Sequence, residues 1–285
     1  AYVRFKSIHL CGFADPWVTH RSSIATKALP LLKRLHMLAI CYYKRLRLSP
    51  DDFYWLEAEV ARQGLIKLIH VAPSRVRVIP NTYADVFSQK NSTLYPRRHD
   101  ETTRIFCIAA PYPHKNLPIV PHVAHLLREK DGHNKFRFIV TLPETGDEVN
   151  RFWKIAQNLN VLDMIENIGT ITLSDCPKWY ASADMVFLPT LLETFSATYP
   201  EAMVMEKPIV TTDLDFARDI CGDAAVYYSP LSAQEAAESI QKVSTDQAFR
   251  EDLIQRGKDR LKQFPDPHEK FNLMMNWIEE IAEAA

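Results

Sequence analysis

Residues 101–264 alternate short apolar segments with amphipathic ones, and this alternation restricts the fold of the chain more than any other feature. Strands that are apolar along their whole length are typical of parallel sheets, because helices cover both faces. The pattern therefore predicts a parallel, doubly wound α/β domain. We expect its strands at 104–109, 135–141, 164–168, 185–189, 208–212 and 224–228.

The amphipathic segments are predicted to be helices. They cover 117–130, 147–159, 176–183, 196–206, 215–221, 232–244 and 246–263, and a last helix over 268–283 follows the break at Pro265 and Pro267.

Residues 1–90 are predicted to form a separate, smaller α/β piece. Strands are expected at 5–11 and 76–79, and an apolar helix with interspersed basic residues at 24–43. The polar stretch 88–103, which contains Pro96 and a run of charged residues at 97–101, is typical of a linker. We therefore divide the chain into a partial N-terminal domain (1–90), a linker (91–103), a sheet domain (104–265) and a C-terminal helix (266–285) that packs back toward the N-terminal domain.

The net charge of −1 hides an asymmetry between the two parts of the chain. Residues 1–100 contain 16 Lys/Arg and 7 Asp/Glu, a balance of +9, whereas residues 101–285 contain 18 and 28, a balance of −10. Such a difference in charge indicates that the two parts bind different partners. The basic part, residues 1–100, would attract an anionic partner. We expect no nucleic-acid partner.

The segment 16–50 contains no acidic residue, and its seven Lys/Arg interleave with leucines such as Leu31, Leu32 and Leu35. One interpretation is a basic amphipathic surface for an anionic membrane or a lipid-linked acceptor. The other is a core-packing helix whose cationic face is solvated.

The cysteines are five in number, widely spaced, and form no C-x-x-C pair. They predict buried thiols in a reduced chain rather than a disulfide framework or a zinc site. The chain also lacks an apolar run long enough to cross a bilayer and a recognisable signal peptide. We therefore expect a cytoplasmic protein, and the membrane interpretation of segment 16–50 would place it at the inner face of the membrane.

Two glutamates, Glu193 and Glu201, follow the strand predicted at 185–189 and are separated by seven residues. A strand followed by a tight loop and a helix N-terminus forms an anion site, because the first helical N–H groups lack intrahelical partners. Carboxylates accept hydrogen bonds from sugar hydroxyls. The segment therefore predicts either a site for a sugar diphosphate, with N–H donors at Thr194, Phe195, Ser196 and Ala197, or an ordinary helix start flanked by two glutamates.

Lys115 lies in the sequence Pro113-His114-Lys115-Asn116, after the first strand of the same domain. Its ammonium would emerge at the sheet edge where Glu193 is expected, and there it could neutralise a diphosphate leaving group. A solvated lysine after a proline-rich turn is the other interpretation.

Two further residue sets are weaker candidates. Asp213 and Asp215 form a D-x-D pair, which we interpret as a helix cap rather than a metal site. Asp15 and His20 follow the first predicted strand and are candidate catalytic residues in the N-terminal piece.

The blocks at 113–116, 168–184, 193–201 and 207–213 together resemble the C-terminal domain of retaining GT-B glycosyltransferases, specifically glycosyltransferase family 4. The resemblance implies a GT-B fold, with a Rossmann-like doubly wound parallel-sheet domain after the partial N-terminal α/β domain. It also implies that Lys115 contacts the donor phosphates, Glu193 the transferred sugar and Glu201 the ribose. The backbone at 194–196 would bind the sugar and diphosphate, and Thr170 and Ile171 would border the base.

The sequence departs from the family pattern at several positions. Ala110 stands where an arginine is usual, and the turn Glu193-Thr194-Phe195-Ser196 has no glycine, so it must avoid positive φ or tolerate strain. The family's glycine-rich loop near the start of the N-terminal domain is absent, and we expect the first part of that domain to be missing, disordered or heavily reduced.

The resemblance implies a retaining, metal-independent glycosyltransferase that takes a nucleotide-sugar donor and no further cofactor. The acceptor, a glycan or a lipid-linked molecule, would enter from the side of residues 1–90. Two alternatives stay open: a non-catalytic GT-B-like binding subunit, and a nucleotide-sugar epimerase or phosphorylase on the same architecture.

Overall fold

The computed structural model describes residues 7–20, 23–88, 102–132 and 135–283. Contacts divide the chain into two units. Unit 1 contains Ala1–Thr82, Leu192–Ala197 and Phe264–Ala285, and unit 2 contains Tyr83–Leu191 and Thr198–Gln263. The domain boundaries predicted from the sequence, at residues 90 and 265, differ from the boundaries of the two units by a few residues. The prediction also does not assign residues 192–197 to unit 1. The predicted linker lies outside the described residues except for 102–103.

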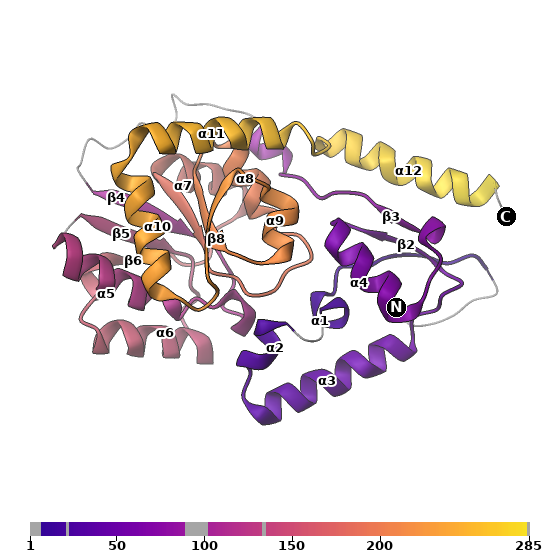
Figure 1. The fold of residues 1–285 in the computed structure, drawn as a ribbon, viewed down its shortest axis with the longest axis horizontal. Coiled ribbons are helices and arrows are strands. Elements are labelled where there is room, and N and C mark those ends of the chain that lie inside the picture. Colours follow the sequence, from indigo (N-terminus) through magenta and orange to yellow (C-terminus); the bar gives the residue numbers. More distant parts are fainter. Residues whose placement is uncertain (1–6, 21–22, 89–101, 133–134, 284–285) are drawn as a thin grey trace. The chain divides into compact units, whose positions relative to one another are not determined.

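Unit 2 is built on a six-stranded parallel sheet of order β6-β5-β4-β7-β8-β9. Figure 1 labels β4, β5, β6 and β8 among its strands. Each strand lies within two residues of its predicted bounds. The strands are β4 (Thr103–Cys107), β5 (Phe136–Val140), β6 (Ile165–Asn167), β7 (Met185–Leu188), β8 (Ile209–Thr212) and β9 (Ala225–Tyr228).

Helices cover both faces of this sheet. Alternate strand residues such as Ile105, Phe138 and Phe187 pack with α5, α6 and α10, whereas Phe106 meets Tyr180 of α7 on the opposite face. A buried aromatic side chain of this size contributes about 2 kcal/mol, so the sheet is held from both sides. The helices are α5 (Ile119–Asp131), α6 (Asp147–Asn158), α7 (Cys176–Ser182), α8 (Thr198–Val204), α9 (Asp215–Cys221), α10 (Ala233–Thr245) and α11 (Gln247–Leu261).

Unit 1 contains a three-stranded parallel sheet of order β1-β2-β3, formed by Leu10–Gly12, Phe53–Leu56 and Val76–Val78. One face packs on a core that includes Val18 of α1 (Pro16–Thr19), Cys41 of α3 (Leu31–Leu46) and Leu65 of α4 (Glu59–Ile69). Strand β2 and helix α4 have no counterpart in the prediction from sequence.

The other face of this small sheet packs on α12 (Pro267–Glu283), through Trp277 and Ile281. Arg77 of β3 lies over the Trp277 ring at 3.9 Å and donates to both oxygens of Glu280. These contacts place the C-terminal helix within unit 1.

The helix predicted over 24–43 is two helices, α2 (Ile24–Ala28) and α3. The chain leaves helical geometry at Leu29 (ψ 143°) and Pro30 (ψ 146°). The residue before a proline is disfavoured in the α region, and this explains the break.

Candidate functional site

The sheet of unit 2 reverses its strand order between β4 and β7, which pair through Ile105↔Met185 and Phe106↔Val186. Strands β5 and β6 extend the sheet on one side, and β8 and β9 extend it on the other. In open α/β sheets, ligands bind beyond the carboxyl ends of the strands at such a switch point. The loops that follow β4 and β7 therefore form the candidate site.

The loop after β4 carries Lys115 at the end of a 3₁₀ turn, Pro113–Lys115. The next residue, Asn116, is left-handed at φ 51°, a conformation that asparagine tolerates better than most residues. The carbonyl of His114 accepts from the backbone N–H of Leu191 at 2.7 Å and from Thr190 Oγ1 at 3.4 Å. The turn that carries Lys115 is therefore bound to the loop after β7, two residues before Glu193.

The His114 side chain has no role in the sequence-based interpretation, although it stands inside the motif. Its ring stacks on Tyr112, with centroids 5.7 Å apart and planes 5° apart. Burial, and then the neighbouring Lys115 ammonium, lower the pKa of His114 to about 4. The loop thus holds a neutral imidazole beside a cation.

The loop Leu192–Ala197, which continues from the β7 loop, belongs to unit 1. Glu193 is half-buried, while Thr194, Phe195 and Ser196 are buried, and Phe195 packs edge-on against Phe264 at 5.8 Å. None of these residues has a positive φ, so of the two possibilities left open by the sequence, the glycine-free turn avoids the left-handed region.

Helix α8 begins at Thr198, two residues later than predicted. The N–H groups of residues 194–197 therefore belong to the preceding loop and not to the first turn of the helix. Glu201 lies in the first turn of the helix, as the fourth residue of α8.

Glu201 is 9% exposed and accepts a hydrogen bond at Oε2 from the Tyr180 hydroxyl, at 2.8 Å. Burial raises the pKa of the Glu201 carboxyl, and the hydrogen bond from Tyr180 opposes that rise. A carboxylate at a helix N-terminus, with one oxygen already bound, suits a pair of hydroxyl donors.

Thr170 and Ile171 follow β6, farther along the same edge of the sheet. Asn167 fixes the start of this loop, because Oδ1 accepts from the N–H groups of Leu142 and Gly169 at 3.0 and 3.1 Å. Thr170 is exposed and Ile171 half-buried. Their proposed place beside the base, like the ligand roles of Lys115, Glu193 and Glu201, stays a prediction.

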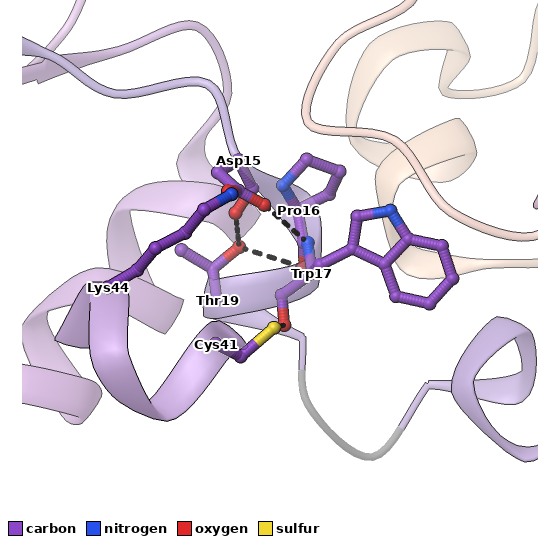
Figure 2. A network of polar contacts seen from close by, with 6 residues as sticks. All are labelled: Asp15, Pro16, Trp17, Thr19, Cys41 and Lys44. Atoms are coloured by element: carbon purple, nitrogen blue, oxygen red, sulfur yellow. Dashed lines mark hydrogen bonds and ion pairs between the residues drawn. The ribbon is translucent and has the colours of Figure 1, made fainter. Parts of the chain in front are cut away.

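Asp15 and His20 take part in local contacts within unit 1 (Figure 2 shows those of Asp15). Asp15 Oδ1 caps α1 by accepting from the N–H of Trp17 at 3.2 Å, and Oδ2 pairs with Lys44 Nζ at 2.5 Å. The Nδ1 atom of His20 is 2.8 Å from Thr19 Oγ1. Both carboxylate oxygens of Asp15 are thus engaged by the protein itself.

The D-x-D pair does not cap a helix as the sequence suggested. Asp213 binds Arg218 through two hydrogen bonds, at 2.5 and 2.8 Å, and Asp215 stands in the first turn of α9 without a capping bond. The hydrogen bonds from Arg218 lower the pKa of Asp213. Across the described ranges, no three His, Cys, Asp or Glu side chains gather closely enough to hold a metal ion.

The fold of the chain is of GT-B type, as in solved structures of glycosyltransferases. A family model described as "Glycosyl transferases group 1" matches residues 95–260, more than half of the chain, and the chain belongs to that family. The resemblance noted in the sequence and the predicted fold class are therefore confirmed.

Relatives and solved structures agree with this assignment. The chain is 18% identical over 222 residues to the O-antigen chain mannosyltransferase RfbU of Salmonella typhimurium, covering 77% of this chain and 57% of the relative. Its fold matches WaaG, a glycosyltransferase involved in lipopolysaccharide biosynthesis (TM-score 0.76, 16% identity, 94% of this chain and 74% of WaaG). It also matches Anabaena HepE in complex with UDP and glucose (TM-score 0.73, 14% identity, covering 96% of this chain and 72% of HepE). The chain spans 28% to 57% of the length of the curated relatives it matches.

Proposed function

We propose that this chain takes part in retaining transfer of a sugar from a nucleotide-diphosphate donor to a glycan or lipid-linked acceptor, without a metal ion. The observation that carries the proposal is the hydrogen bond from Leu191 to His114, which joins the two loops of the switch point. In this proposal Lys115 neutralises the charge that develops on the leaving diphosphate. Glu201 binds the ribose and Glu193 the transferred sugar. Asp15, which caps α1 and pairs with Lys44, has a structural role in unit 1, and His20 stays a candidate catalytic residue.

Two relatives' names support the substrate classes. RfbU is an O-antigen chain mannosyltransferase, and HepE was solved with UDP and glucose. We therefore assign a nucleotide-sugar donor and a surface-polysaccharide type of acceptor to this chain.

The test begins with UDP, GDP and ADP, measured by thermal shift and titration calorimetry. We expect one of them to bind and to raise the melting temperature by mass action. Binding by none would overturn the proposal in favour of a non-catalytic subunit. Transfer with the matching donor should keep the anomeric configuration, as followed by NMR, and inversion would contradict the retaining mechanism.

We also propose that α3 contacts an anionic membrane surface. Its outward side exposes Leu31, Leu32 and Leu35 at 69%, 82% and 55%, in a segment without acidic residues. Apolar side chains flanked by cations favour an interface of anionic headgroups. No helix among the described residues is both long and apolar enough to cross a bilayer.

Cosedimentation with vesicles tests this surface. Binding should be stronger to phosphatidylglycerol vesicles than to phosphatidylcholine, and Leu32→Gln with Leu35→Gln should weaken it about ten-fold. Leu162→Gln, a change at an exposed leucine of unit 2, is the matched control. Equal binding by all variants, or none by the unmodified chain, would reject the membrane role.

A further inference from the structure

Tyr180 is an entirely buried tyrosine whose hydroxyl is directed at a candidate ligand-binding carboxylate. It stands on α7, and its ring meets Phe106 and Phe87 edge-on at 5.1 and 5.6 Å. Two edge contacts and complete burial hold the ring in one position. The hydroxyl therefore reaches Glu201 Oε2 from a fixed direction.

The two oxygens of Glu201 differ in their surroundings. Oε2 accepts from Tyr180, whereas no hydrogen bond from the described residues reaches Oε1. Oε1 is not one of the fully buried polar atoms that lack a partner in the described chain, so it opens to solvent. One oxygen is thus fixed from inside the domain while the other is presented outward.

We propose that Tyr180 is a positioning residue for nucleotide binding: its hydroxyl orients Glu201 and stabilises the ionised carboxylate, so that Oε1 accepts from the ribose hydroxyls of the donor. This inference rests on the proposed function, and it assigns a role to a residue that makes no contact with the ligand. A hydrogen bond to the charged form of a carboxylate favours that form against burial. Without the hydroxyl, protonation of Glu201 would compete with ribose binding at a higher pH.

The groups around Glu201 leave Tyr180 as its one hydrogen-bonding partner in the described part of the chain. Cys176, also on α7, is the other nearby ionisable group. On α11, which packs against α8, Lys258 pairs with Glu206, and a Cβ at Gly257 would meet the Met203 side chain at van der Waals distance. The pH dependence of the site should therefore follow the Tyr180–Glu201 pair.

The experiment compares Tyr180→Phe with the unmodified chain, using UDP, GDP and ADP as probes in calorimetric titrations from about pH 8.5 to about pH 5.5. The Tyr180→Phe variant should bind the preferred nucleotide about three-fold more weakly at the alkaline end, and about thirty-fold more weakly at the acidic end. Inorganic pyrophosphate, which has no ribose, should bind both proteins equally. Tyr228→Phe is the matched control, because Tyr228 is also buried and its hydroxyl has no partner among the described residues.

Parallel pH profiles for Tyr180→Phe and the unmodified chain would overturn the inference and leave the proposed function standing. Absence of nucleotide binding by the unmodified chain would overturn both. Glu201→Gln provides a second measurement that remains decisive if Tyr180→Phe does not fold. It should remove the acidic limb of the pH profile, and persistence of that limb would also overturn the inference. In the Glu201→Gln background the tyrosine change should have no further pH-dependent effect.

Discussion

The backbone N–H of Leu191 donates to the carbonyl of His114 at 2.7 Å, across the point where the large sheet reverses its strand order. Main-chain bonds of this kind do not depend on side-chain rotamers, so they fix one loop against the other. Lys115 directly follows His114, and Glu193 follows Leu191 by two residues. The bond thus joins the loop after β4 to the start of the loop after β7, within unit 2.

Replacing Lys115 should weaken the binding of a nucleoside diphosphate without unfolding the domain. The half-buried ammonium would lose its attraction for the phosphates, and we expect Lys115→Met to raise the dissociation constant by about 10- to 100-fold. Lys130→Met, at an exposed position of α5, is the control and should bind as the unmodified chain does. Equal affinities for the two variants in calorimetry would remove Lys115 from the site.

Adding the cation that the family pattern usually has should strengthen binding. Ala110 is exposed in the loop after β4, so a longer side chain meets no core. We expect Ala110→Arg to lower the dissociation constant by about three- to ten-fold at low salt, with the gain shrinking as salt rises. Ala110→Glu should have the opposite effect, and a gain from both would show that charge is not the cause.

The sequence predicts the strands of unit 2 closely because each is apolar along its length, so the limits of each apolar run mark the strand. It does not predict β2 and α4, because no glycine or proline separates Phe53–Leu56 from Glu59–Ile69, and Gly64 weakens the helical pattern of the second segment. Strand order depends on tertiary packing, and the β4–β7 neighbourhood cannot be derived from local periodicity. The same holds for the contact between Tyr180 and Glu201, which are 21 residues apart. Tyr180 lies within one of the blocks that resemble the family. A tyrosine in a buried helix usually finds a hydrogen-bond partner for its hydroxyl, and this is the only signal in the sequence that could have pointed to the contact.

Acid should destabilise the domain through His114. Its pKa in the folded chain, about 4, lies below the ordinary value of 6.5, because burial and Lys115 disfavour the cation. Below pH 6.5 the unfolded chain takes up a proton that the folded chain takes up only near pH 4. The free energy of unfolding should therefore fall by about 2 kcal/mol over this interval, after a discount for partial exposure.

Urea unfolding at a series of pH values measures this loss. His114→Gln should flatten the dependence between pH 6.5 and pH 4, while His122→Gln, a change at an exposed histidine of α5, should leave it unchanged. An unaltered profile for His114→Gln would assign the acid sensitivity to other groups.

Asp15→Asn should affect stability more than catalysis. An asparagine oxygen can still accept from the Trp17 N–H, but the ion pair with Lys44 is lost. We expect unit 1 to lose about 0.5–1 kcal/mol, and the turnover rate to stay within about three-fold. Lys44→Met breaks the same ion pair and should give the same loss of stability. A fall in turnover of about a hundred-fold or more with Asp15→Asn alone would assign Asp15 to the reaction.

Removing divalent metal should leave donor binding unchanged. In the D-x-D pair, both oxygens of Asp213 are held by Arg218, whose guanidinium also lies 4.3 Å from the centroid of the Tyr227 ring. A divalent cation would have to displace this guanidinium, so the leaving diphosphate is expected to rely on Lys115 instead. EDTA should therefore change the nucleotide dissociation constant by less than about two-fold, and Asp213→Asn should have no larger effect. The matched measurement is a titration with added Mn²⁺. Strict dependence of binding or transfer on Mn²⁺, lost in Asp213→Asn, would show that the aspartate exchanges its arginine for a metal when the donor binds.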